Sequence, residues 1–150
     1  ARETVYEIAR ALDKNVVVLA GDTHNAWSSD LRVGAGAFAG AAVGVEFATS
    51  SVTSPGFEEY LGAGFLADQL AFALTSLANL NTLGAGARLA GSLKYAETAK
   101  RGYLVMTVTA NEARSDWYVV DTVQAKTYQA SLNKSLRALP GAANRKLVTV

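Results

Sequence analysis

Residues 16–24 decide the fold class, and they read Val16-Val17-Val18-Leu19-Ala20-Gly21-Asp22-Thr23-His24. The first five are aliphatic and mostly β-branched, which predicts a strand buried on both faces within an α/β layer. The strand should end at Gly21, where the chain is expected to turn sharply. The polar residues after it would then lie at the carboxyl end of a buried strand, where α/β sheets bind their ligands.

The residues around this strand predict further helices and strands. A short helix is expected from about Arg2 to Leu12, because apolar residues recur there at i, i+3, i+4 and i+7. Residues 28–32 look polar and irregular, whereas residues 43–49 alternate as a strand. A polar loop is predicted at 50–56, and leucine and phenylalanine at helical spacing predict a helix over about 57–80.

The C-terminal third predicts an antiparallel arrangement. Residues 103–109 and 117–123 alternate between apolar and polar side chains, as the two strands of a hairpin do. Pro140-Gly141 marks a turn, and residues 147–150 could form a last short strand. The fold class is therefore predicted as α/β with a mixed sheet whose final strands are antiparallel.

Composition limits the classes of function. The chain has 150 residues and a net charge of +1, which suggests one domain and gives no electrostatic signal for binding nucleic acid. It lacks cysteine, so disulfides and thiolate metal sites are excluded. Residues 69–87 are uncharged but contain Gln, Asn, Thr and Ser, so no membrane span is expected. The chain begins at Ala1 without an initiating Met, and it is expected to start inside a longer protein.

Asp22 and His24 are the candidate metal ligands and catalytic residues. A carboxylate suits hard cations and an imidazole suits iron, zinc or manganese, so together they predict part of a dinuclear site. The side chain of Asn25 could bind a metal or a phosphate oxygen. The alternative is structural: a lone histidine is usually a surface or packing residue, and an aspartate after a strand is common as a turn residue or helix cap.

Three other groups of residues give weaker evidence for a function. Gly34 to Ala39 matches a loose dinucleotide fingerprint, but no buried strand precedes it, so a flexible loop is expected. Ser50, Ser51, Thr53 and Ser54 lack a nucleophile elbow, and a polar turn after a strand is predicted there. Lys94, Lys100 and Arg101 form a small basic group that is expected to be a solvated turn, with a phosphate contact as the alternative.

Four stretches in order resemble PhoD-like alkaline phosphatases, which are calcineurin-like metallophosphoesterases. The motif at Val16–Trp27 resembles the C-terminal metal motif of that family. The other stretches resemble its serine-rich loop, the stretch leading into its late strands, and its closing strand: Val45–Gly56, Leu93–Tyr95 with Lys100–Tyr103, and Trp117–Val123. The resemblance spans roughly Thr4 to Val123.

The resemblance implies a fold and an activity. The fold would be the C-terminal part of a four-layer α/β/β/α metallophosphoesterase sandwich. The family hydrolyses phosphomonoesters and phosphodiesters with iron and calcium in its best-known type. Asp22 and His24 match the positions of metal ligands, and export to the periplasm or outside the cell is expected.

Two departures leave an alternative open. The family's first metal motifs precede this region and are absent from the chain, so the N-terminal half of the same domain is the expected partner and the isolated chain is expected to be inactive. The family often has Asn-Pro-His where this chain has Ala90-Gly91-Ser92, which leaves substrate preference open. The alternative is a degenerate, non-catalytic fragment with a structural role, which an upstream reading frame without ligand motifs would support.

Overall fold

The computed structural model describes residues 1–34, 40–56, 59, 69, 73 and 92–150. The elements are α1 (Arg2–Ala11), β1 (Val16–Ala20), β2 (Ala26–Arg32), β3 (Ala42–Ala48), β4 (Leu93–Glu97), β5 (Gly102–Val108), β6 (Ala113–Val120), β7 (Ala130–Ala138), a 3-10 helix η4 (Ala142–Asn144) and β8 (Val148–Thr149). The helix expected over 57–80 lies outside the described residues, apart from Glu59, Gln69 and Ala73, which are helical. Most of the Gly34–Ala39 motif lies outside them too.

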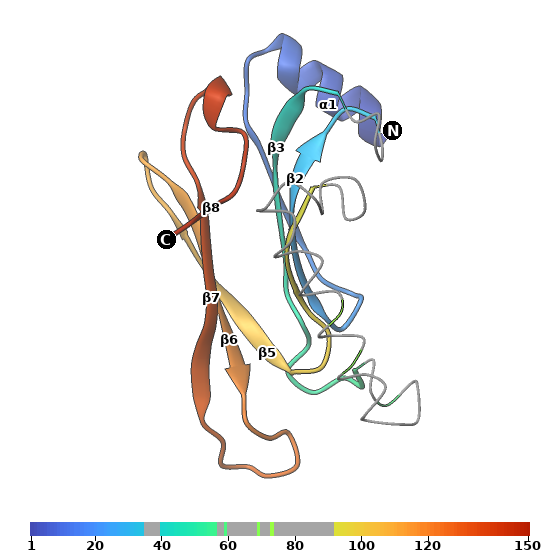
Figure 1. Cartoon of the computed structure of the whole chain (residues 1–150), viewed down its shortest axis with the longest axis vertical. Coiled ribbons are helices and arrows are strands. Elements are labelled where there is room, and N and C mark those ends of the chain that lie inside the picture. Colours follow the sequence, from blue (N-terminus) through green and yellow to red (C-terminus); the bar gives the residue numbers. More distant parts are fainter. Residues whose placement is uncertain (35–39, 57–58, 60–68, 70–72, 74–91) are drawn as a thin grey trace.

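The strands form two four-stranded sheets that face each other (Figure 1). The first has the order β1-β3-β2-β4, with β1 parallel to β3 and β2 antiparallel to both of its neighbours. The second has the order β5-β6-β7-β8 and is antiparallel throughout. The predictions of a mixed sheet and of antiparallel final strands are confirmed, but the final strands form a second sheet of their own rather than part of the mixed one. The described residues are mostly β-structure, with helix α1 beside β3.

Strand β2 occupies the stretch that was expected to be irregular, so that prediction is wrong. Two of its polar side chains, Ser28 and Asp30, are buried but hydrogen-bonded, which allows a polar sequence to pair as a strand. Ser28 Oγ donates to the Glu46 carbonyl at 2.7 Å. Asp30 accepts a hydrogen bond from the Leu147 backbone N–H at 2.8 Å, and this bond joins the two sheets.

The second sheet contains the predicted hairpin, formed by β5 and β6, and the short last strand β8. Strand β6 begins at Ala113, earlier than expected, and β7 was not predicted at all. The reason is composition: only Leu136 and Ala138 of β7 are buried, so the strand carries little apolar alternation. Tyr103 and Tyr118 stack across β5 and β6 at 5.4 Å between ring centroids, a cross-strand pair that stabilises the hairpin.

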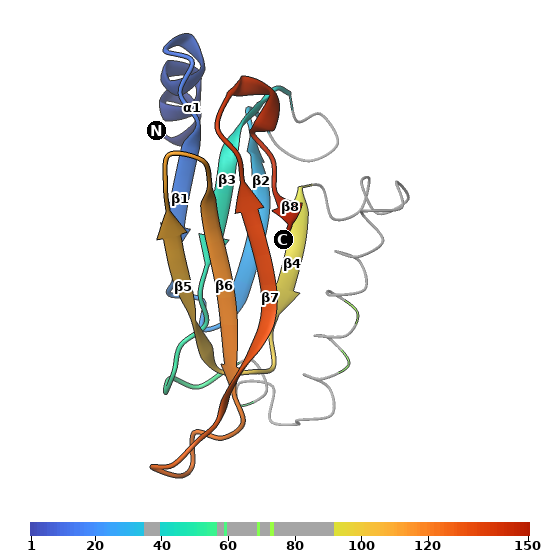
Figure 2. The same ribbon diagram turned by 90° about the vertical axis from the view of Figure 1, so that its left-hand side faces the viewer.

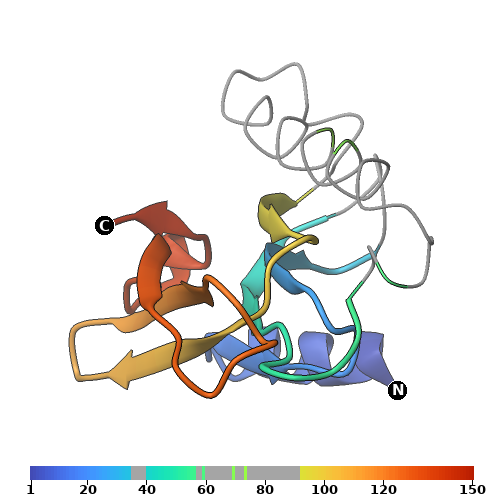
Figure 3. The ribbon, with the colours of Figure 1, turned by 90° about the horizontal axis from the view of Figure 1, so that it is seen from below.

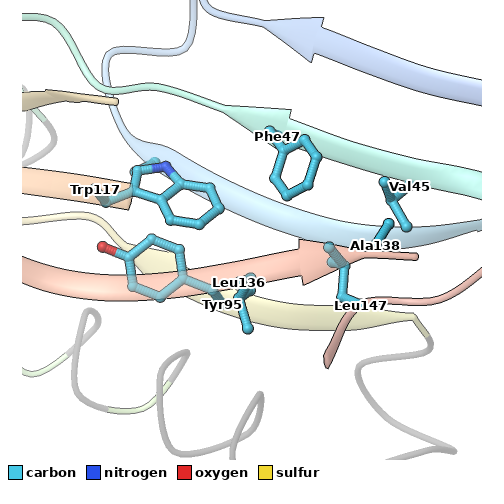
Figure 4. Packing of buried hydrophobic residues seen from close by; sticks show 8 residues of the cluster. Val45, Phe47, Tyr95, Trp117, Leu136, Ala138 and Leu147 are labelled. Carbon is cyan, nitrogen blue, oxygen red and sulfur yellow. The ribbon is translucent and has the colours of Figure 1, made fainter. Parts of the chain in front are cut away.

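The core lies between the two sheets (Figure 4). Trp117 is 2% exposed, and its ring contacts those of Phe47 and Tyr95 at centroid distances of 5.8 and 4.9 Å. Its indole N–H donates to the Ala48 carbonyl at 2.9 Å, so the one polar atom of the ring is satisfied. The core residues Val45, Leu136, Ala138 and Leu147 continue this contact along both sheets.

Strand β1 is not buried on both faces, contrary to the prediction. It lies at the edge of its sheet among the described strands, and Val17 and Leu19 are 42% and 61% exposed. Strand β5 runs along the same side of the molecule in the second sheet (Figure 2). A mainly apolar pocket of about 150 Å³ opens there, lined by Val17 of β1, Val45 of β3 and Val108 of β5 among others. Within the part of the chain that the structure describes, one side of the sandwich core is therefore open.

Helix α1 confirms the predicted position but not the predicted packing. Its only buried residue is Tyr6, whereas Val5, Ile8 and Leu12 on the predicted apolar face are more than half exposed. Viewed from below, α1 lies along the first sheet, away from the second (Figure 3). None of the helices in the described part of the chain has the length and hydropathy of a membrane-spanning segment.

Candidate metal centre

The loop after β1 has an unusual backbone at both candidate ligands. Asp22 has φ 73° and His24 has φ 59°, the left-handed region that few residues other than glycine adopt. The chain turns at Gly21, whose carbonyl accepts a hydrogen bond from the Thr23 N–H at 2.9 Å, but Gly21 itself does not have a positive φ. Such backbone conformations cost free energy and often occur at functional sites. The observation therefore points to the same two residues as the sequence motif.

The imidazole of His24 is oriented by the serine-rich loop, residues 50–56. Its Nδ1 lies 2.8 Å from the Pro55 carbonyl oxygen. A carbonyl oxygen only accepts hydrogen bonds, so Nδ1 carries the proton and donates it. This leaves Nε2 as the nitrogen with a free lone pair, the arrangement that metal-binding histidines use.

The carboxylate of Asp22 is exposed and makes no hydrogen bond or ion pair with any described residue. It is therefore available to a cation without breaking an existing contact. No group of three or more His, Asp or Glu side chains suited to a metal occurs among the described residues. Asp22 and His24 fit a metal site by donor chemistry, and they are two ligands rather than a full shell.

Asn25 fits only one of its two expected roles. Its Oδ1 accepts a hydrogen bond from the indole N–H of Trp27, which can only donate, so the amide orientation is assigned. The atom suited to a metal is thus engaged. Nδ2 is buried and has no partner among the described residues. An amide N–H cannot bind a metal, but it can donate to a phosphate oxygen.

The serine-rich loop is a polar turn, as predicted for Ser50, Ser51, Thr53 and Ser54. Ser51 Oγ accepts hydrogen bonds from the backbone N–H groups of Thr53 and Ser54, at 3.2 and 2.8 Å. The loop is also joined to the second sheet, because the Gly102 N–H donates to the Ser51 carbonyl at 3.1 Å. It therefore bridges His24 and the first residue of β5.

The three basic residues do not gather into a phosphate-binding group or a solvated turn. Lys94 pairs with Asp30 at 3.4 Å, and Lys100 is exposed. Arg101 is only 7% exposed, and burial lowers the pKa of its guanidinium without removing the charge. The sequence prediction missed its role, because its partners Ser54 and Glu59 lie 47 and 42 residues away, beyond any local pattern.

Ser92 lies beside Asp30, whose backbone N–H donates to the Ser92 carbonyl at 2.9 Å. This position is further along β2 than Ala26, the end of that strand nearest His24. Ala90 and Gly91, the rest of the stretch that departs from the expected Asn-Pro-His, lie outside the described residues.

A model of the family described as PhoD-like phosphatase matches residues 1–117. The chain belongs to the PhoD-like phosphatase family. The matched span contains Asp22, His24, the serine-rich loop and Arg101, so the predicted family is confirmed over the whole candidate site. No match was found among curated proteins.

A solved structure described as "Structure of PhoD" has the same fold, with a TM-score of 0.69 and 24% sequence identity. The similarity covers 99% of this PhoD-like chain and 25% of that chain. The chain therefore spans a quarter of the length of the solved structure it resembles.

Proposed function

We propose that the protein hydrolyses phosphomonoesters and phosphodiesters with metal ions that Asp22 and His24 help to hold. The observation that carries the proposal is the loop after β1. There, a carboxylate without a partner among the described residues and an imidazole with its Nε2 lone pair free stand two residues apart, both at positive φ. Membership of a phosphatase family supports the reaction class.

Each residue has a role that its chemistry suits. The Asp22 carboxylate would bind a hard cation, and the His24 Nε2 would bind a metal that favours nitrogen. Calcium and iron are the metals that the family resemblance implies. When bound, such ions polarise a phosphoryl oxygen and lower the pKa of water. Asn25 Nδ2 would donate a hydrogen bond to a phosphate oxygen of the substrate.

The site needs ligands beyond the two that the described residues offer. We infer that they come from the remainder of a four-layer metallophosphoesterase domain, of which this chain would be the C-terminal part. Coverage of only a quarter of the solved structure supports this, as does the open side of the core between β1 and β5. The 150 residues alone should then be inactive. Export from the cytoplasm is proposed from the family resemblance alone.

A second candidate is a non-enzymatic function, which is favoured by the fact that only two candidate ligand side chains occur together among the described residues. The chain would then be a degenerate phosphoesterase fold with a structural role. The upstream reading frame distinguishes the two, since the enzyme requires further Asp, Asn or His ligand motifs there.

The test is phosphatase and phosphodiesterase activity of the full natural protein, with and without a chelator, for wild type and Asp22→Asn. Asp13→Asn is the matched control, because Asp13 is also an exposed aspartate at positive φ, at the other end of β1. Asp22→Asn and the chelator should each lower activity by roughly a hundred-fold or more, with Asp13→Asn near wild type. Activity that is indifferent to both treatments rejects the metal assignment, and no activity with any metal favours the structural role.

A further inference from the structure

Arg101 holds the serine-rich loop from the second sheet. Its Nε donates to the Ser54 carbonyl at 2.9 Å, and its Nη2 donates to a Glu59 carboxylate oxygen at 2.8 Å. Its own backbone is anchored, because the Val120 N–H donates to the Arg101 carbonyl at 3.0 Å. The guanidinium is therefore a fixed part of the interior, with two different partners for two of its N–H groups.

The Ser54 carbonyl is one peptide bond from the residue that orients His24. Ser54 is followed by Pro55, whose carbonyl oxygen accepts the hydrogen bond from His24 Nδ1. A rotation or displacement of the Ser54–Pro55 peptide would move that acceptor away from the imidazole. Two other bonds act on this loop: the Gly102 N–H donates to the Ser51 carbonyl, and Ser51 Oγ accepts from the Ser54 N–H. Neither involves the Ser54 carbonyl or Pro55.

We propose that Arg101 is a positioning residue for His24: through Ser54 it holds the Pro55 carbonyl where it selects the imidazole tautomer with Nε2 free for a metal. The inference rests on the proposed function for its consequence in metal binding. Its first step, control of the His24 tautomer, is independent of any metal. Contacts that fix a ligand histidine in this way usually change metal affinity when they are removed.

Arginine is required in this role because of its shape. The planar guanidinium presents Nε–H and Nη2–H in fixed directions, and here each has a different acceptor, on Ser54 and Glu59. A lysine keeps the charge but has a single ammonium on a flexible stem, so it cannot hold both acceptors in one geometry. Arg101→Lys therefore removes the orientation while retaining the charge.

Arg145 offers a matched control at the opposite end of the first sheet. It is 8% exposed, donates to Asn15 through Nε at 2.8 Å and pairs with Asp13 at 2.7 Å. Like Arg101, it is a buried arginine whose guanidinium has two different acceptors, but it lies next to the start of β1 rather than its end. Arg145→Lys should reproduce the loss of stability without any effect on His24.

The experiment uses the full natural protein labelled with nitrogen-15, with the His24 signals identified by their loss in His24→Gln. At a pH where the imidazole is neutral, the ring shifts report the tautomer. Wild type and Arg145→Lys should show the proton on Nδ1. Arg101→Lys should show a mixture and, in calorimetric titration with Mn²⁺ alone, a dissociation constant about 10- to 100-fold higher. Melting temperatures should fall in both lysine variants.

Wild-type ring shifts in a folded Arg101→Lys protein overturn the inference, as does an equal change in Arg145→Lys. If Arg101→Lys does not fold, Glu59→Gln provides the test, because it weakens the Glu59 contact of the guanidinium and leaves Arg101 in place. A tautomer shift in the same direction then supports the inference, and a wild-type spectrum rejects it. If wild type binds no Mn²⁺ or other metal, the proposed function fails, whereas the tautomer still decides the positioning role.

Discussion

Gly44→Ala should separate β1 from β3 and weaken the strand that presents Asp22 and His24. Gly44 is the register partner of Val16, the first residue of β1. A Cβ at position 44 would lie 1.8 Å from the Val16 carbonyl oxygen and 2.6 Å from its carbonyl carbon. Both neighbours are backbone atoms, so no side-chain rotation relieves the overlap. The two strands themselves have to move apart.

The geometry sets the magnitude. Relief of the overlap requires a separation of roughly 1 Å, which stretches ladder bonds beyond hydrogen-bonding length. Loss of two such bonds, with looser packing of the neighbouring valines, should lower the free energy of unfolding by about 2–4 kcal/mol. If the 150 residues unfold as one unit, the melting temperature should fall by roughly 5–15 °C.

Gly21→Ala is the matched control, because a Cβ at position 21 meets nothing within 4 Å. It should be neutral or stabilise by up to about 1 kcal/mol through the unfolded state. Urea unfolding followed by the fluorescence of Trp27 and Trp117 measures both variants. If the two differ by less than about 0.5 kcal/mol, the close approach of β1 and β3 at Gly44 is not a constraint and the reasoning is refuted.

Two further predictions concern the second sheet. Trp117→Phe removes the indole N–H that donates to the buried Ala48 carbonyl, so it should lower the free energy of unfolding by about 2–4 kcal/mol. Urea unfolding followed by circular dichroism measures this loss. A loss below about 0.5 kcal/mol contradicts the role of that bond. Burial raises the pKa of Asp116, but hydrogen bonds from Arg114 and Ser135 lower it by more, so the net shift is downward. The ionised carboxylate therefore stabilises the fold above about pH 4, and this stabilisation is lost as the pH falls through the lowered pKa. The melting temperature of Asp116→Asn should consequently fall less steeply than that of wild type as the pH is lowered in the acid range. An unchanged dependence on pH would contradict the assignment.

The parts of the fold that could be predicted are those with local signals. The aliphatic run of β1, the alternation of β3 and the β5–β6 hairpin each depend on neighbouring residues, and all were located to within a few positions. Strand β2 could not be recognised in this way, because Asp30 is stabilised by Leu147, 117 residues away. The exposure of Val17 and Leu19 was also missed, since burial depends on which strands flank β1 rather than on its own composition.

The residues of the candidate site could likewise be predicted from the sequence only where the signal is local. Asp22 and His24 were found because residue type and position after a strand carry the chemistry of metal binding. The contacts that orient His24 could not be found, because Pro55 lies 31 residues away and Arg101 acts on the loop from the second sheet. Neither contact leaves a periodic pattern in the sequence.

The positive φ angles of Asp22 and His24 lower the stability of this loop, whereas the side chains of these residues serve the proposed metal binding. Glycine adopts positive φ without the roughly 1–2 kcal/mol that a side chain costs there. Selection for stability alone would therefore favour glycine at both positions, and consensus or computational stabilisation that scores only the backbone would favour it too. An engineer who wants a more robust variant should leave these two residues unchanged and look for stability elsewhere in the two sheets.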